Sequence, residues 1–233
     1  MATINSSTTR GSVRVSGLDT TFASWEEVRD LTNATVVSVN GNTAGAIGAD
    51  ESIGKLGTTW GCRRYFMAFD TSSVTSVPGS ATLYVYGQTN NTSDLIAVKA
   101  TAPTTSTNLA TTDYSNIVGY TPGSLLPMEG YVTEYSGPIS SGWNLAGYNA
   151  IPLTAAALSD MDSLSTLQLA LVNYTFDYQF LGWFGGSYLT GVNVTNQPYI
   201  EYTNFSGNIF SIPLANISKV NDVLKGNINK MNT

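Results

Sequence analysis

Paired carboxylates are the residues of this chain whose types and spacing come nearest to catalytic chemistry. Hydrolysis of a glycosidic bond needs two of them, about 5 to 9 Å apart across the sugar. Three pairs lie close together in the sequence: Glu26 with Glu27, Glu129 with Glu134, and Asp160 with Asp162. In a strand, neighbouring residues face opposite sides, and short acidic residues after an alanine-rich turn usually cap or solvate it. We therefore interpret all three pairs as solvated loop carboxylates. A contribution to a calcium site stays open, although no D-x-[DN]-x-[DN]-G pattern supports it.

Other kinds of catalysis lack the residues that they require. The chain has no histidine and a single cysteine, Cys62. Ser-His-Asp and Cys-His catalysis are therefore excluded, and so are a common zinc site and an intrachain disulfide. Neither G-x-x-x-x-G-K-[ST] nor a G-x-G-x-x-G that follows an expected strand is present, so nothing indicates nucleotide chemistry. We predict that the protein is not an enzyme and holds no cofactor.

Exposed aromatic rings are the other candidates for specific binding, because they can stack on sugars. Trp183 and Phe184 lie in the sequence LGWFGG, and one of the two rings would point outward whichever way the segment alternates. Large rings are more often found in cores and interfaces. A glycan contact and a protein interface both stay open for Trp183 and Phe184.

Composition limits the partners of the chain. Charged residues make up 11% of 233 residues and the net charge is −6, whereas about 25% charged residues is usual. The ten basic residues are scattered, so we expect neither a nucleic acid nor an anionic membrane as partner. The sequence contains no apolar run long enough to span a bilayer and no signal-peptide pattern at its start. We expect synthesis in a cytoplasm without ordinary export.

The most informative stretch is residues 62–87, which alternates with the period of two that is typical of strands. Tyr65, Met67 and Phe69 fall on one face of its first arm, and Leu83 and Val85 on one face of its second. The link between the arms contains Pro78 and Gly79, which break regular structure. We predict a central hairpin whose apolar face is covered by a second layer.

Further short strands are expected along most of the chain. We expect them at residues 13–16, 35–39, 95–99, 131–135, 163–173, 176–190 and 199–203. Residues 22–31 fit a strand or a short helix, residues 41–59 a long loop or weak hairpin, and residues 113–117 one helical turn. Regularly spaced short strands indicate an all-β fold, a jelly-roll β-sandwich with short helical turns. We divide the chain into a flexible arm (1–11), the sandwich (12–212) and a C-terminal tail (213–233).

The tail contains an internal repeat of eleven residues. The sequences NISKVNDVLKG at 216–226 and NINKMNT at 227–233 match at Asn, Ile, Lys and Asn. A few apolar side chains with a lysine in each unit suit docking onto another surface. The alternative is a polar chain end whose sequence happens to repeat. The anchor residues are expected to be Ile217, Lys219, Val220, Asn221, Ile228, Lys230, Met231 and Asn232.

Two resemblances follow from these stretches. The segment RYFMAFDTSSV with ATLYVY resembles the central hairpin of the jelly-roll family named for its DNRLRE motif, although the naming motif is absent. The tail resembles the I-x-K-V-N-G-V repeats of structural proteins in tailed phages of Bacteroidetes, including crAss-like phages; Asp222 stands where they usually carry Gly.

These resemblances imply a virion structural protein: a capsid decoration, a vertex or head-fibre component, or a tail accessory protein. They also imply that the protein is located in the virion. Its expected partners are other virion proteins and further copies of itself, in a homo-oligomer for which a trimer is preferred. The alternative is a carbohydrate-binding module that recognises host cell-surface glycans.

Overall fold

The computed structural model describes residues 1–16, 24–39, 45–54, 57–91, 94–139, 142–182, 185–193, 195–204, 208–209 and 212–213. All strand pairs in this part of the chain are antiparallel. The first sheet has the order β1 (Ala2–Asn5), β11 (Tyr199–Asn204), β6 (Pro78–Asn91) and β8 (Tyr148–Pro152). A separate pair is formed by β12 (Asn208–Ile209) and β13 (Ile212–Pro213).

The second sheet is built around β5 (Gly57–Asp70). One edge of β5 pairs with β2 (Gly11–Ser16), which in turn pairs with β3 (Val36–Val39). The other edge pairs first with β4 (Gly45–Gly54) and then with β9 (Thr166–Asn173). The sheet continues from β4 to β10 (Ser187–Val192) and from β9 to β7 (Leu95–Lys99).

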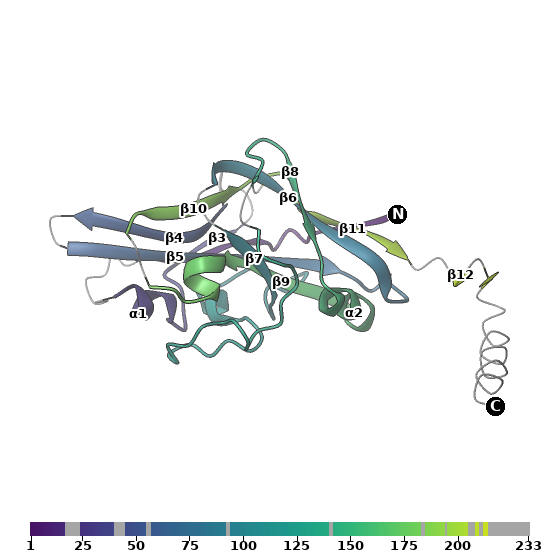
Figure 1. Cartoon of the computed structure of the whole chain (residues 1–233), viewed down its shortest axis with the longest axis horizontal. Helices are drawn as coiled ribbons and strands as arrows, with labels where there is room; N and C mark the ends of the chain where they lie inside the picture. Colours follow the sequence, from purple (N-terminus) through teal and green to yellow (C-terminus); the bar gives the residue numbers. More distant parts are fainter. Residues whose placement is uncertain are drawn as a thin grey trace, which may run out of the picture.

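The two sheets are joined along β6, whose two halves belong to different layers. Its first half pairs with β11 and β8, and Gly87 and Asn91 pair with β10 of the second sheet. The two layers are therefore parts of one continuous sheet of eleven strands. This sheet folds over on itself (Figure 1). The prediction of an all-β sandwich with short helices is confirmed.

The central stretch differs from the predicted hairpin in one important respect. Both arms are strands, but β5 and β6 do not pair with each other; the first half of β6 lies in the first sheet, whereas β5 lies in the second. The link at residues 71–77 crosses from one layer to the other, and Thr71 N–H donates to the carbonyl of Ser165 beside it. The apolar faces of the two arms consequently contribute to the same core from opposite sides.

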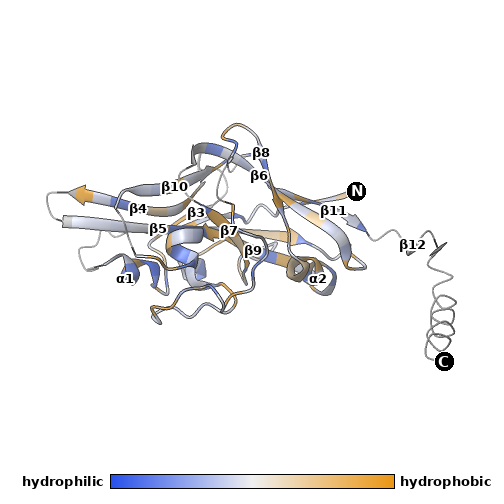
Figure 2. Cartoon of the chain, in the orientation of Figure 1, coloured by the Kyte–Doolittle hydropathy of each residue, from blue (hydrophilic) through white to orange (hydrophobic). Residues whose placement is uncertain are grey.

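Two cores lie on the two faces of the second sheet. The first core fills the sandwich with Tyr65, Met67 and Phe69, and α2 (Ala155–Ser163) adds Ala157 and Met161 to it. The second core contains Cys62 and Phe66 on the opposite face of β5. Figure 2 shows β7 and β9, which separate the two cores, coloured as hydrophobic. This is the pattern expected of strands that are buried on both faces.

A layer of loops and short helices covers the second core and makes a third layer below the two sheets (Figure 1). We call it the loop layer. Its regular elements are α1 (Trp25–Arg29), the 3₁₀ helix η1 (Thr111–Ser115) and the π-helix η2 (Tyr174–Tyr178). Ser24 is the N-cap of α1, and its hydroxyl accepts a hydrogen bond from Glu27 N–H.

Several expected elements are different in the structure. Residues 2–5 form β1 instead of a flexible arm, because the edge of β11 offers them hydrogen-bond partners. Residues 131–135 are a loop with one isolated bridge, Val98 to Glu134. Of the long loop and the weak hairpin expected at residues 41–59, the hairpin is the one found, because β4 pairs regularly with β5. The predicted strand at 176–190 begins as η2, since the Asn173 side chain accepts from Phe176 N–H and caps a helical turn there.

Replacing Leu169 by Ala should test the first core. Leu169 is fully buried on β9 opposite Met67, so its truncation should lower the free energy of unfolding by about 2 to 5 kcal/mol. Urea unfolding should show a lower midpoint with an unchanged slope. Ile53→Ala is the matched control, because Ile53 is 79% exposed and its truncation should leave the midpoint nearly unchanged. Equal midpoints for the two variants would contradict this description of the core.

Candidate functional site

The carboxylates that suggested catalysis lie on α1, in the loop layer and on α2. Glu26 and Glu27 occupy the first turn of α1, where negative charge complements the helix dipole. Glu134 accepts a hydrogen bond from the Tyr178 hydroxyl. The Asp160 carboxylate accepts from Lys99 Nζ at 2.9 Å and from the Tyr135 hydroxyl at 2.5 Å. These contacts give Glu134 and Asp160 roles in the structure.

The geometry of a metal site is absent from the part of the chain that the structure describes. There, no three His, Cys, Asp or Glu side chains are placed to share an ion. No acidic cluster of that size among the described residues supports the calcium site left open by the sequence.

An ion-pair cluster of Arg29, Arg64 and Asp177 lies inside the second core. Arg64 binds the Asp177 carboxylate with two hydrogen bonds, Nε to Oδ2 and Nη2 to Oδ1, both at 2.8 Å. Arg29 Nε lies 3.2 Å from Asp177 Oδ1, and its Nη2 donates to the Asp177 carbonyl at 2.7 Å. All three side chains are essentially excluded from solvent.

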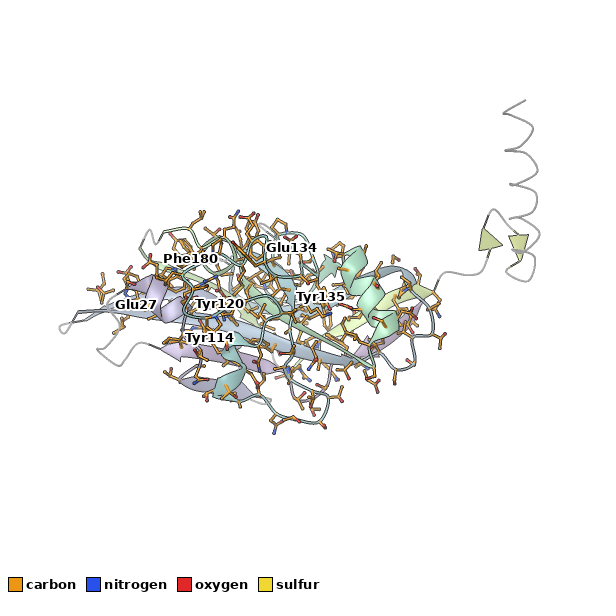
Figure 3. The ribbon with its side chains drawn as sticks, turned by 90° about the horizontal axis from the view of Figure 1, so that it is seen from below. Glu27, Tyr114, Tyr120, Glu134, Tyr135 and Phe180 are labelled. Atoms are coloured by element: carbon orange, nitrogen blue, oxygen red, sulfur yellow. The ribbon has the colours of Figure 1, made fainter. Side chains whose placement is uncertain are left out.

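Aromatic rings enclose the two guanidinium groups. Arg64 lies 4.1 Å from the centre of the Tyr114 ring and 4.7 Å from that of Tyr120. Arg29 lies 4.5 Å from the Phe180 ring centre and 5.1 Å from that of Tyr120. Figure 3 labels Tyr114, Tyr120 and Phe180 in the loop layer. Rings stacked on a desolvated cation stabilise it by about 2 kcal/mol.

The electrostatics of the cluster favour the charged forms of its members. Burial by itself would raise the pKa of Asp177, but the two guanidinium groups outweigh it and hold that pKa below its ordinary value. Burial would lower the pKa of Arg64, whereas Asp177 raises it well above the ordinary value. Burial, followed by the charge of Asp177, raises the pKa of the nearby Cys62 thiol to about 12, which makes that thiol unreactive.

The cluster also fixes the loop above it. Arg29 Nη1 donates to the Leu126 carbonyl at 2.8 Å. The neighbouring Asp30 accepts from Leu125 N–H at 2.7 Å and from the Tyr120 hydroxyl at 2.9 Å. Leu125 and Phe180 both have a positive φ, 53° and 57°, a conformation that side chains other than glycine adopt only when their surroundings enforce it. The closed cluster therefore serves to hold this loop in one conformation.

The fixed loop presents apolar side chains to solvent around a small cavity, which we call the loop pocket. Its volume is about 160 Å³ and it is lined by Gly119, Tyr120, Thr121, Ser124, Leu126, Pro127 and Tyr131. Leu125, Leu126 and Tyr131 are 53%, 46% and 60% exposed. A cavity of this order can hold a benzene-sized apolar group.

A second exposed feature is a group of aromatic rings on the outer face of the first sheet. We call Tyr84, Tyr86, Tyr148 and Tyr199 the tyrosine row. Tyr84 stacks on its cross-strand partner Tyr199 with ring centres 4.8 Å apart. Tyr148 lies edge-on to Tyr86 at 5.2 Å and to Tyr199 at 5.0 Å. The four rings connect β8, β6 and β11, and Tyr148 is 40% exposed.

The binding residues expected from sequence are not tested by this geometry. Trp183 and Phe184, and the eight anchor residues of the tail repeat, lie outside the described residues. Two features of the structure were not predicted from the sequence. The tyrosine row could have been predicted, because Tyr84 and Tyr86 alternate in the sequence with Leu83 and Val85, which are buried. No pattern in the sequence predicts the ion-pair cluster, because its members lie as much as 148 residues apart.

Comparisons with known proteins add no assignment. No family model matches the chain, and no curated protein matches its sequence. Within the described ranges, the helices are all too short or too polar to cross a lipid bilayer.

Replacing Asp177 by Asn should test the ion-pair cluster. The change removes the negative charge that neutralises two buried arginines, so we expect the free energy of unfolding at pH 7 to fall by about 3 to 5 kcal/mol. Thermal and urea unfolding would measure the loss. Asp162→Asn, at an exposed position of α2, should change little.

The same variant should alter the pH dependence. The folded pKa of Asp177 is below its ordinary value. Its stabilising contribution is thus complete above the unfolded pKa of about 4, and it is lost as the pH falls through the folded pKa. The wild type should therefore lose more stability than Asp177→Asn between about pH 5 and pH 2. Parallel pH profiles would show that Asp177 is not held as a carboxylate.

Proposed function

We propose that this protein is a non-enzymatic structural component of a phage virion, namely a capsid decoration, a vertex or head-fibre component, or a tail accessory protein. The observation that carries the proposal is the eleven-residue repeat at residues 216–232, which resembles the terminal repeats of structural proteins in tailed phages. The repeat would anchor the body to neighbouring virion proteins or to other copies of itself.

The body has features that suit such a passive role. Many of its few charged groups are used inside the fold: Arg29, Arg64 and Asp177 in the second core, and Arg63 with Asp50 on the second sheet. Lys99 likewise pairs with Asp160 of α2. Exposed apolar and uncharged side chains are then available for contact with other subunits, as in symmetric assemblies.

Particle composition should test the proposal directly. Purified virions analysed by mass spectrometry should contain the protein in many copies, and its absence from the particle would refute the virion role. A chain truncated after Pro213 should keep the strand signature of the wild type in circular dichroism but be depleted from particles by at least tenfold. A full-length chain with residues 214–233 in scrambled order is the matched control for length and composition. Normal incorporation of either variant would show that the repeat is not the anchor.

Glycan binding is a second candidate function, and the tyrosine row is the observation that favours it. The row offers aromatic surface next to hydrogen-bonding groups on one face of the first sheet. Burial, followed by the Glu201 carboxylate, raises the pKa of Tyr84. A virion protein with such a face could also bind host glycans.

Removing the most exposed ring of the row should test this candidate. If a glycan array identifies a ligand, Tyr148→Ala should weaken its binding by about tenfold, which corresponds to ~1.4 kcal/mol. Tyr131→Ala removes an exposed tyrosine of the loop layer and should not weaken it. Isothermal titration of both variants would measure the difference. No glycan binding, or equal losses for the two variants, would exclude the row as a sugar site.

A further inference from the structure

Charge is distributed unevenly between the body and the tail. Residues 214–233 contain three lysines and one aspartate, a net charge of +2, so the preceding residues carry −8 of the total of −6. Between Lys99 and Lys219 the sequence has no basic residue at all. The tail is therefore a short basic and apolar peptide on an acidic protein.

The loop pocket is complementary to such a peptide. Its exposed lining is apolar, with Leu126 and Tyr131 at the rim. Glu129, an exposed acid, lies two residues before Tyr131 in the same loop. One apolar side chain of the peptide could fill the pocket while a lysine approaches Glu129.

The pocket is also ready for binding without rearrangement. The Leu126 carbonyl is held by Arg29, and the Leu125 N–H by Asp30. Tyr120, which lines the pocket, donates its hydroxyl proton to Asp30 and packs on both buried guanidinium groups. A binding surface that is already ordered avoids the entropic cost of ordering it on association.

We propose that the C-terminal repeat of one copy binds the loop pocket of a second copy. In an extended peptide, residues two apart lie on the same side. Ile217 with Lys219, or Ile228 with Lys230, would then present an apolar side chain to the pocket and an ammonium group to Glu129. This inference rests on the proposed self-association through the repeat and names the surface that receives it.

A second copy is the occupant because of where the chain leaves the body. The final strand of the sandwich, β11, ends at Asn204 on the side of the molecule away from α1 (Figure 1). Tyr120 lies in the loop layer toward the α1 side (Figure 3). Contact between neighbouring copies joins these two ends of the body and produces a repeating assembly. The two repeat units give each chain two segments that fit the same pocket.

Disulfide trapping between two single variants of the full chain should test this contact. Thr121→Cys places a thiol at the pocket, and Asn221→Cys places one in the repeat. Because each variant carries only one of the two new thiols, a bond between them must join different molecules. The native Cys62 is fully buried and should not compete. Mild oxidation of the mixture should give a covalent heterodimer, identified by peptide mass spectrometry.

Matched controls make the result specific. Thr58→Cys, at an exposed position of β5, should give at least tenfold less heterodimer with Asn221→Cys than Thr121→Cys does. Adding Ile217→Asp and Ile228→Asp to the tail chain, or Leu126→Asp to the pocket chain, should reduce the trapped product to the Thr58→Cys level. Glu129→Lys should reduce it severalfold at low salt.

Two outcomes would overturn the proposal. One is an equal yield for the Thr121→Cys and Thr58→Cys mixtures. The other is an intrachain bond alone in a Thr121→Cys/Asn221→Cys double variant that is monomeric by light scattering. Failure of trapping with the protein still present in virions would reject the pocket but not the virion role. Efficient trapping with the protein absent from virions would support the pocket contact and reject the virion role.

Discussion

The rest of the structure depends on the contact between Arg64 and Asp177. It joins the middle of β5, the longest strand of the second sheet, to the short π-helix that follows β9. Arg29 binds the same carboxylate from α1, so three segments far apart in the sequence meet at one buried charge. Its aromatic neighbours come from η1 and from the irregular part of the loop layer. The loop layer, which has little regular structure, thereby acquires a defined position on the sheet.

Burying these charges is expensive, and the structure shows how the cost is offset. An isolated charge in a protein interior costs several kcal/mol even after relaxation. Here the Asp177 carboxylate accepts from both arginines, and their remaining donors reach main-chain carbonyls of Tyr114, Leu126 and Asp177 itself. The Tyr114 hydroxyl donates to the carbonyl of Arg29, and the Tyr120 hydroxyl lies within hydrogen-bond distance of both that carbonyl and the Asp30 carboxylate. A network satisfied to this degree favours one arrangement of the loops over alternatives.

The consequence for function is that the exposed surfaces are preformed. On one side, the loop layer presents an apolar pocket whose backbone is bonded to the cluster. On the other side, the first sheet presents the tyrosine row on strands that are paired along β6. The loop pocket has an exposed apolar lining and the tyrosine row exposes aromatic rings, features that would suit the proposed contacts with other subunits or with glycans.

The sequence by itself determined the type of structure. The alternation of Tyr65, Met67 and Phe69 identified β5 and its inward face, and the alternation around Leu83 and Val85 identified β6, because side chains of a strand alternate with a period of two wherever the strand lies. The absence of histidine and the single cysteine likewise excluded whole classes of chemistry, because those mechanisms need side chains that this chain does not contain.

Only the tertiary structure decided how these strands are combined. The sequence placed β5 and β6 in one hairpin, whereas the structure places them in different sheets, because strand pairing depends on which edges are available and not on the alternation itself. Residues 2–5 became a strand for the same reason, since β11 offered an open edge. Arg64 lies on the face of β5 opposite to Tyr65, and its burial depends on Asp177 and Tyr114, which approach it from distant segments. Long-range contacts of this kind leave no periodic trace in the sequence, and they are what turned a polar loop region into an ordered surface.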